Sequence, residues 1–586
     1  MFDRIRRAAR VVRALAFTGP DSNGTLAREF ERRAASHPRR PFLIFQGARY
    51  SYEEANALVN RHAHAYRELG IGPDDVVALM MDNRPELLWH FLAAGKLGAV
   101  ASLINTHNVG EPLAHSLRIC EPALIVVGAE HAPEVEAVAD GLPANASVHV
   151  QDDPWSDGQS AASARPRFDA LLESASTADP DSTGQQRLGD LGAYIYTSGT
   201  TGLPKAARVT QRRLVGLGWV LGGVGWVMRE DDVIYNPLPL YHTSGMGVCT
   251  ASVICWGATM VLARRFSASG FWDDVRRHEA TGFVYIGELC RYLVNQPSRD
   301  DDADNPIRVA VGNGLRPDIW REFQDRFGIE RIAEFYGSTE GNVGTINLDG
   351  TVGSVGRLLS GSGVLVRWDD DADDFVRGPD GFMVKCKPGE AGVLIGRITR
   401  RSRFDGYQDE SATEKKVLRD VFKPGDAWFN TGDMLRMDGR RRLFFVDRMG
   451  DTFRWRGENV STFEVQEQIS TFDRVKEVNV YGVHIHGTEG RAGMAALVLD
   501  GQFDPDAFRR HVDEALPPYA RPVFVRLLGA METTGTLKLK KTELRDEGFD
   551  PAQVSDPIFL RHPQHDAYVP LTPELHAAIV GGGLRL

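Results

Sequence analysis

The sequence predicts an α/β protein with a large N-terminal domain of layered sheets and helices and a small α+β C-terminal domain. At 586 residues the chain is too long for one hydrophobic core, so two or more domains are expected. From Gly24 to Gly128, apolar stretches of strand length alternate with helical stretches, which is typical of a largely parallel sheet covered by helices. Two strands and a helix between Asp451 and Asp550 predict the smaller domain.

The composition argues against several classes of protein. With 42% apolar and 25% charged residues, the chain has the make-up of an ordinary soluble protein. The net charge of −11 argues against a nucleic-acid partner, which would need a basic surface. The five cysteines form no C-x-x-C pair, which indicates reduced thiols and neither a disulfide framework nor a zinc site. Because the N-terminal stretch lacks the uninterrupted apolar core of a signal peptide, we expect a cytoplasmic protein.

Residues 1–20 form a basic amphipathic segment. Apolar residues recur at helical spacing between Met1 and Phe17, and five arginines are opposed by one acid, Asp3. Such a helix can lie on an anionic surface with its apolar side down, which predicts peripheral contact with the inner face of the cell membrane. The alternative, weighted equally, is a short helix that packs on the protein body.

Strands and helices alternate over the next hundred residues. We predict strands at Pro41–Phe45, Asp75–Met80 and Ala99–Ile104, and helices at Tyr52–Leu69 and Arg84–Leu97. We expect Asn105 and His107 to cap the helix that follows, and a substrate-side loop is the alternative. The Ser-, Ala-, Asp- and Pro-rich stretch Asp152–Gly184 predicts a surface loop.

A predicted strand ending near Tyr196 leads into the stretch T-S-G-T-T-G-L-P-K. Its candidate phosphate-binding residues are Thr197, Ser198, Gly199, Thr200, Thr201, Gly202 and Lys205. Hydroxyls and glycine N–H groups can surround an anion, and the lysine charge is worth about 4 kcal/mol at roughly 4 Å in partly screened surroundings. The spacing differs from the P-loop pattern G-x-x-x-x-G-K-[ST]. We predict a polyphosphate-binding loop, with a solvated loop as the less favoured alternative.

The motif Y-T-S-G-T-T-G-L-P-K resembles the phosphate loop of the adenylate-forming superfamily, which includes acyl-CoA synthetases, luciferases and peptide-synthetase adenylation domains. The resemblance covers nearly the whole chain. It implies an enzyme that uses ATP to activate a carboxylate as an acyl-adenylate and then passes the acyl group to a thiol. It also implies that the small C-terminal domain is mobile.

Two long stretches without charge follow the loop, Leu214–Met228 and Thr243–Ala263. The second is long enough to span a membrane, but its Gly, Ser, Thr and Cys residues make its centre weakly hydrophobic. We expect a buried helix followed by a core strand, with a membrane span as the less favoured alternative. Between the stretches lies His242, which by resemblance borders the carboxylate site. A histidine packed in the core is the alternative.

A second group of motifs resembles the nucleotide site of the superfamily. The turn Gly312-Asn313-Gly314 would border the adenine, where close approach of the backbone requires missing side chains. In E-F-Y-G-S-T-E-G-N, Tyr336 offers a flat face to the base, Thr339 can donate to the α-phosphate, and Glu340 can bind Mg²⁺. The other ATP-binding residues of this segment are Gly337 and Ser338.

Further motifs resemble the ribose and hinge positions of the superfamily. Asp433 in F-N-T-G-D corresponds to the aspartate that accepts hydrogen bonds from both ribose hydroxyls. Arg448 corresponds to the arginine that also reaches the ribose. Gly450 stands at the pivot of the small domain, where many members have Asp or Lys, so the details of the movement are left open. Gly457 corresponds to the glycine that borders the path of coenzyme A.

The small domain carries the lysine that the resemblance makes catalytic. Two residues separate it from the T-G of the usual loop, and the downstream K-x-x-x-x-E-L aligns it with Lys538, with Lys540 as the alternate. The predicted boundaries are 1–20 for the basic segment, 21–447 for the ATP- and fatty-acid-binding domain, 448–450 for the hinge and 451–586 for the lid.

The acidic run Asp369–Asp374 could be read as a calcium loop. It lacks the spaced ligands, the glycine and the distal glutamate of an EF-hand, so we predict a solvated hairpin.

Three stretches are similar to the fatty-acid-transport-protein branch, the very-long-chain acyl-CoA synthetases: Y-I-G-E-L-C-R-Y-L, F-Y-G-S-T-E-G-N and F-R-W-R-G-E-N-V. The resemblance implies a ligase that converts ATP, a long- or very-long-chain fatty acid and CoA into acyl-CoA, AMP and pyrophosphate, with Mg²⁺. Coupling to fatty acid uptake and the oligomeric state are left open. The alternatives are an acyl-AMP ligase that serves a carrier protein or an amine, and a non-catalytic fatty acid transporter.

Overall fold

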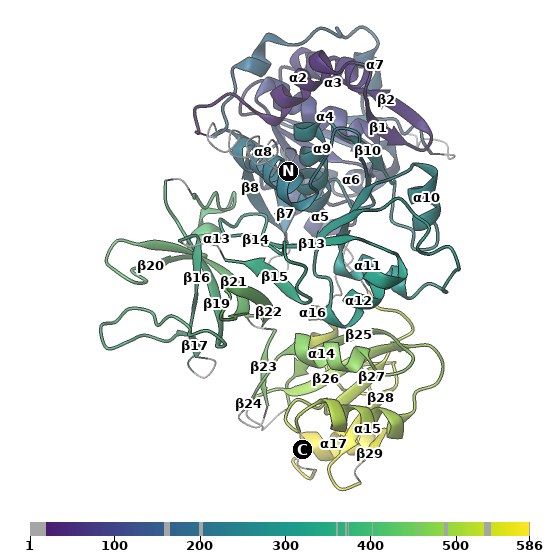
Figure 1. The fold of residues 1–586 in the computed structure, drawn as a ribbon, viewed down its shortest axis with the longest axis vertical. Coiled ribbons are helices and arrows are strands. Elements are labelled where there is room, and N and C mark those ends of the chain that lie inside the picture. Colours follow the sequence, from purple (N-terminus) through teal and green to yellow (C-terminus); the bar gives the residue numbers. More distant parts are fainter. Residues whose placement is uncertain are drawn as a thin grey trace. The chain divides into compact units, whose positions relative to one another are not determined.

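The chain divides into two compact units in the computed structural model (Figure 1). Unit 1 comprises Met1–Gly314, Glu322–Thr351 and Ile398–Val417, and unit 2 comprises Leu315–Arg321, Val352–Arg397 and Leu418–Leu586. The structure describes residues 19–156, 164–197, 203–358, 361–369, 372, 374–400, 402–449, 451–455, 458–485, 490–532, 541–565, 567–584 and 586. The predicted basic segment 1–20 therefore lies, up to residue 18, outside the described residues, and its predicted helix lies wholly outside them.

One sheet of unit 1 holds the strand that leads into the predicted phosphate loop. Its described strands run in the order β6 (Ser147–Gln151), β5 (Leu124–Gly128), β3 (Val76–Met80), β4 (Val100–Leu103), β7 (Leu191–Thr197) and β8 (Lys205–Thr210). All pairs are parallel except β7–β8, which form an antiparallel hairpin. β4 and β5 are buried along their whole length, as expected of parallel strands covered on both faces.

The other sheet of unit 1 carries the predicted nucleotide motifs. Its described strands run in the order β14 (Thr345–Ile346), β13 (Arg331–Tyr336), β12 (Val309–Asn313), β11 (Gly282–Ile286), β9 (Val233–Asn236), β10 (Thr259–Leu262), β1 (Pro41–Phe45) and β2 (Ala48–Ser51). The strands from β13 to β1 are parallel. The carboxyl ends of parallel strands meet at one edge, so the segments after β12 and β13 are neighbours.

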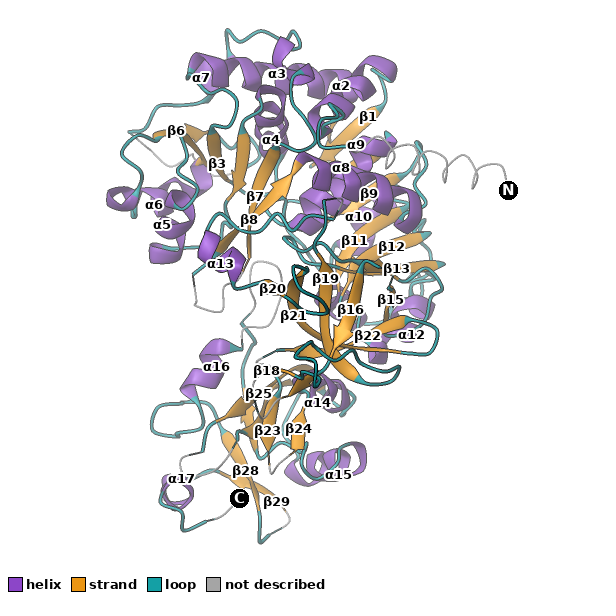
Figure 2. Cartoon of the chain, turned by 90° about the vertical axis from the view of Figure 1, so that its left-hand side faces the viewer, coloured by secondary structure: helices purple, strands orange, loops and turns teal. Residues whose placement is uncertain are grey.

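Helices pack against these sheets (Figure 2). They are α2 (Leu26–Ser36), α3 (Tyr52–Glu68), α4 (Pro85–Leu97), α5 (Gly110–Arg118), α6 (Ala132–Glu136), α7 (Asp169–Leu172), α8 (Gln211–Val220), α9 (Ala251–Trp256), α10 (Phe271–Arg277), α11 (Gly287–Val294) and α13 (Glu410–Glu414), with α12 (Pro317–Arg326) shared by both units. A capping box of Ser51 and Glu54 begins α3, and Gly98, at φ +79°, ends α4. α2 packs on α4 and α9, and α8 packs on α9.

Unit 2 contains a smaller antiparallel sheet with strands in the order β15 (Ser354–Arg357), β22 (Arg442–Arg448), β21 (Ala427–Met437), β19 (Ala391–Arg397) and β16 (Gly363–Val366). The short strands β17 (Trp368–Asp369) and β18 (Asp374–Phe375) form the hairpin predicted for the acidic run. A further short strand is β20 (Val417–Arg419).

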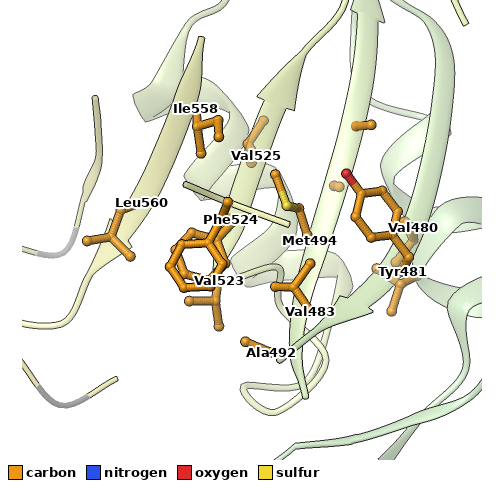
Figure 3. Close-up of a cluster of buried hydrophobic side chains, with 14 of the residues drawn as sticks. Val480, Tyr481, Val483, Ala492, Met494, Val523, Phe524, Val525, Ile558 and Leu560 are labelled. Carbon is orange, nitrogen blue, oxygen red and sulfur yellow. The ribbon is translucent and has the colours of Figure 1, made fainter. Parts of the chain in front are cut away.

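The C-terminal part of unit 2 has a core of its own. Its sheet runs β25 (Val475–Val483), β26 (Ala492–Leu499), β27 (Phe524–Leu527), β28 (Ile558–His562) and β29 (Ala567–Pro570), next to a hairpin of β23 (Phe453–Trp455) and β24 (Glu458–Val460). The helices are α14 (Thr462–Ser470), α15 (Pro505–Ala515), α16 (Thr542–Glu547) and α17 (Pro573–Val580). Figure 3 shows buried side chains from β25 to β28 in one cluster, and Phe524 stacks on Phe549 at 4.3 Å.

Most predicted elements are confirmed within two or three residues. The matching pairs are Pro41–Phe45 with β1, Asp75–Met80 with β3, Ala99–Ile104 with β4, Tyr52–Leu69 with α3 and Arg84–Leu97 with α4. The stretch Thr243–Ala263 forms a buried helix and a core strand, α9 and β10. No helix in the described part of the chain is both long and apolar enough to cross a membrane. All five cysteines are free thiols.

Two local predictions are wrong. The N-cap of α5 is Val109, without a side-chain bond, whereas Asn105 accepts from the N–H of His107. The stretch Asp152–Gly184 is not all surface loop, because Phe168 is fully buried and α7 follows it. Phe168 packs against three side chains of α3 and α4, His62, Tyr66 and His90. A single apolar residue with a distant partner gives no periodic signal.

Candidate active site

The hairpin of β7 and β8 brings together the two ends of the predicted phosphate loop. Thr197 on β7 is paired with Lys205 on β8. Ser198, Gly199, Thr200, Thr201 and Gly202 lie outside the described residues. The hydroxyl of Tyr196 donates to Ser116 O at 2.6 Å and so anchors the end of β7. Lys205 Nζ lies 5.8 Å from the centre of the Tyr407 ring, within the range of a cation–π contact.

A buried arginine holds the loop that follows β13. Arg213, on α8, donates to Ser338 O at 2.5 Å and also to Gly341 O. Burial lowers the pKa of Arg213, and the nearby acids Asp405 and Glu340 act in the opposite direction. Because the guanidinium binds both ends of the turn, the backbone around Thr339 and Glu340 is held from a different element.

Thr339 and Glu340 are both buried, and each contacts a side chain from another segment. The hydroxyls of Thr339 and Thr243 lie 2.8 Å apart, and Tyr407 donates to Glu340 Oε1 at 2.7 Å. Burial and the charge of Glu340 raise the pKa of Tyr407, so its hydroxyl stays a donor. Within the described part of the chain, Oε2 of Glu340 has no hydrogen-bond donor. Among the described residues, the carboxylate thus has one oriented oxygen, Oε1, and one oxygen without a donor, Oε2.

His242 lies beside Thr243 and is half-buried. The N–H of Ser244 donates to its Nδ1 at 3.3 Å, so in the neutral ring the proton is on Nε2. The π-helical turn Ser244–Thr250 follows directly, a local geometry that is frequent at functional sites. The hydroxyl oxygen of the preceding residue, Tyr241, lies 3.3 Å from Nδ1 of His107.

The turn Gly312-Asn313-Gly314 leaves the carboxyl end of β12, next to the end of β13 that carries Tyr336. Gly314 has a φ of +83°, in the region that favours glycine. Tyr336 and Asn313 are half-buried, and Gly337 is exposed. Adjacent strands of one sheet thus present both predicted adenine contacts at one edge.

Unit 2 brings Asp433 and Arg448 together. They are register partners on β21 and β22, and Arg448 Nε lies 3.3 Å from Asp433 Oδ1. Asp433 is buried, whereas the Arg448 side chain is 55% exposed and can reach a ligand. The Thr431 hydroxyl accepts from the N–H of Asp433 at 3.0 Å, which orders the turn. Gly450, Gly457, Lys538 and Lys540 lie outside the described residues.

Another group of potential metal ligands, Asp82, Glu130 and His131, is already neutralised by neighbouring cations. Arg264 Nη2 lies 3.2 Å from Asp82 Oδ2, and Arg84 Nε lies 3.4 Å from Glu130 Oε1. Burial by itself would lower the pKa of His131, but the hydrogen bond to Asp82 and the charges of Asp82, Glu130 and Glu134 together raise it. These features describe an ion-pair network.

Sequence reasoning missed Arg213, Thr243 and Tyr407. Arg213 directly precedes the first charge-free stretch, Thr243 is the first residue of the second, and Tyr407 comes more than sixty residues after Glu340. No spacing rule links residues that meet only in the folded chain.

Two family models match the chain. The one described as AMP-binding enzyme covers residues 30–395, and the one described as AMP-binding enzyme C-terminal domain covers residues 464–538. The chain belongs to the AMP-binding enzyme family. It is 40% identical over 580 residues to the long-chain fatty acid transport protein 6 of Mus musculus, across 96% of this chain and 91% of that protein. It is also 40% identical over 562 residues to the medium/long-chain-fatty-acid–CoA ligase FadD6 of Mycobacterium tuberculosis, across 95% and 91%.

The fold has solved counterparts. The crystal structure of the anthranilate CoA ligase AuaEII in complex with anthranoyl-AMP superposes with a TM-score of 0.77 at 21% identity, over 92% of this chain and 100% of that one. The predicted superfamily, the fatty-acid-transport-protein branch and the α/β fold class with a large N-terminal and a small C-terminal part are thereby confirmed.

Proposed function

We propose that this AMP-binding enzyme is an ATP-dependent long-chain fatty acid–CoA ligase that acts through an acyl-adenylate. The observation that carries the proposal is the buried Thr339–Glu340 pair, held by Arg213, Thr243 and Tyr407, in a chain 40% identical to a fatty-acid–CoA ligase. A carboxylate oriented through one oxygen can bind the Mg²⁺ that accompanies ATP, which a carrier of fatty acid alone would not need.

In the first half-reaction the fatty carboxylate attacks the α-phosphorus of ATP, and the bond to the bridging oxygen breaks to release pyrophosphate. We assign the phosphates to the loop from Thr197 to Lys205 and the α-phosphate to Thr339. Tyr336 and the turn Gly312-Asn313-Gly314 receive the adenine. His242 borders the carboxylate, and Lys538 neutralises the charge that develops on the phosphate oxygens.

The residues around Glu340 fit a magnesium ion. Mg²⁺ prefers carboxylate and phosphate oxygens, and Oε2 of Glu340 is the oxygen left without a donor in the described part of the chain. When bound, the ion supplies positive charge next to the phosphates as pyrophosphate leaves. Tyr407 keeps the carboxylate in one orientation.

In the second half-reaction the thiol of CoA attacks the acyl carbonyl, and AMP leaves. Asp433 and Arg448 hold the ribose, the small domain turns about Gly450, and Gly457 borders the path of CoA. The boundaries 21–447, 448–450 and 451–586 belong to this proposal. So do a cytoplasmic location and peripheral membrane contact through residues 1–20, which would bring the enzyme close to lipidic substrates.

AMP and pyrophosphate release from purified protein tests the function. With ATP, Mg²⁺ and a series of fatty acids, we expect AMP release to require CoA and to match pyrophosphate release. Lys538→Ala should abolish it, while Lys540→Ala is the matched control that should retain it. Acyl-AMP that accumulates regardless of CoA would favour a ligase serving a carrier protein. No turnover on any acid would contradict the proposal and leave transport or binding.

A further inference from the structure

Three residues stand in one row across neighbouring strands of the sheet that carries the nucleotide motifs. Tyr285 of β11 is paired with Gly312 of β12, and Gly312 is paired with Glu334 of β13. Residues in one row of a parallel sheet project to the same face. The Tyr285 hydroxyl reaches across the row and donates to Glu334 Oε2 at 2.5 Å, and both side chains are buried.

The middle position of the row has to be glycine. A Cβ on Gly312 would lie 2.2 Å from Tyr285 O and 2.5 Å from Cγ of the tyrosine ring. Real Cβ atoms do not approach backbone this closely, so any side chain at 312 would push the tyrosine away from Glu334. Glycine is therefore required at position 312 by the packing of Tyr285, in addition to any close approach of a ligand.

The same carboxylate holds the turn after β12. The N–H of Gly314 donates to Glu334 Oε1, so one oxygen binds the turn and the other binds Tyr285. Burial, together with the charge of Glu334, raises the pKa of Tyr285, which keeps the hydroxyl protonated as a donor. Gly314 at φ +83° is the point at which the chain turns back.

We infer that Glu334 and Tyr285 are positioning residues that hold the Gly312-Asn313-Gly314 turn in the shape that receives the adenine base. The inference rests on the proposed function, in which this turn borders the adenine and Tyr336 covers its face. Recognition of the base then depends on a buried pair that does not touch the nucleotide.

Two fragments of ATP separate this role from a general loss of structure. Adenosine carries the base, tripolyphosphate carries only phosphates, and each is used as a competitive inhibitor against ATP. Tyr285→Phe keeps the ring over Gly312 and removes only the hydroxyl. We expect it to raise the inhibition constant of adenosine about tenfold, the size of one lost hydrogen bond to a charged group, and to leave that of tripolyphosphate within about twofold.

Glu334→Gln is the second variant and should show the same selective rise. In the double variant, the inhibition constant of adenosine should be no higher than in the more affected single variant, because both substitutions remove the same linkage. Tyr66→Phe is the matched control: Tyr66 is equally buried, and its hydroxyl lies 2.7 Å from His90 Nδ1, on elements that do not carry the turn. It should change neither constant.

Two outcomes would overturn the inference: both constants rising together in the variants, or neither changing. If the wild-type protein does not turn over ATP and adenosine has no effect on it, the proposed function fails and takes the inference with it. If the wild type turns over ATP and binds adenosine, but the variants do not raise the inhibition constant of adenosine selectively, the positioning role alone is contradicted.

Discussion

At the scale of single residues, Tyr407 connects two predicted site residues that lie on different segments. Its hydroxyl donates to Glu340, and its ring lies under Lys205. An isolated bridge between Ala207 and Tyr407 places it against β8, and the N–H of Tyr407 donates to the hydroxyl of Thr413 on α13. A partner that orients a metal-binding carboxylate commonly affects metal affinity by 10- to 100-fold.

Tyr407→Phe should therefore raise the Mg²⁺ concentration needed for half-maximal activity by about tenfold, because Glu340 loses the donor that orients it while the ring under Lys205 remains. The measurement is a Mg²⁺ titration of AMP release at saturating ATP. Tyr194→Phe is the control, since Tyr194 is a nearby tyrosine whose hydroxyl binds Gln408. An unchanged Mg²⁺ requirement in Tyr407→Phe would contradict the assignment of Glu340 to the metal.

At the scale of elements, α3 and α4 enclose two neutral histidines. His62 Nδ1 donates to Leu58 O at 2.8 Å, and its ring lies 4.6 Å from that of His90. Burial lowers the pKa of His62 from 6.5 to about 4 and lowers the pKa of His90 as well. The unfolded chain binds protons at these sites more readily than the folded chain, so the stability they contribute is complete above pH 6.5 and is lost as the pH falls.

The free energy of unfolding should fall by about 3 kcal/mol for His62 alone between roughly pH 6.5 and pH 4. In His62→Phe, urea-unfolding midpoints at pH 7.5 and 5.0 should differ less than in the wild type. His64→Phe, two residues along α3 and only half-buried, is the control and should keep the wild-type difference. Equal pH dependence in His62→Phe and wild type would show that His62 does not titrate as its burial implies.

At the scale of the whole molecule, a cluster spans the predicted hinge. Asp447, near the end of β22, accepts from the N–H of Thr462 at 2.6 Å and from its hydroxyl at 3.1 Å. Lys541 Nζ donates to the same hydroxyl at 2.9 Å. Burial raises the pKa of Asp447, against the charge of Lys541. The cluster ties α14 to β22 across the predicted hinge 448–450, so the proposed turning of the small domain would have to break it.

Thr462→Val should weaken this tie, because valine keeps the backbone bond and loses the two bonds of the hydroxyl. We expect trypsin to cut after Arg448, whose side chain is 55% exposed, at least about fivefold faster, since the loss of either hydrogen bond alone is worth about 1 kcal/mol for a local opening. The rate is measured from the fragment that ends at Arg448. Thr471→Val, at the other end of α14, is the control. Equal cleavage rates in all three proteins would exclude this cluster as a restraint on the hinge.

The sequence by itself determined what depends on neighbours along the chain. Periodicity predicted β1, β3, β4, α3 and α4, and contiguous motifs placed Thr197, Lys205, Thr339 and Glu340 in the candidate site and the chain in its family. These signals are local, because strand alternation, helix periodicity and a glycine-rich turn each extend over a few residues.

Only the tertiary structure decided which distant side chains support the site. The supporting hydrogen bonds join segments far apart in the sequence. Arg213 donates to the loop after β13, Tyr407 donates to Glu340, and Tyr285 donates across Gly312 to Glu334. The capping prediction for His107 was wrong for the same reason, since its side-chain partner, Tyr241, comes from a distant segment. Lateral register between strands and packing between layers bring these residues together, and neither leaves a periodic trace in one sequence.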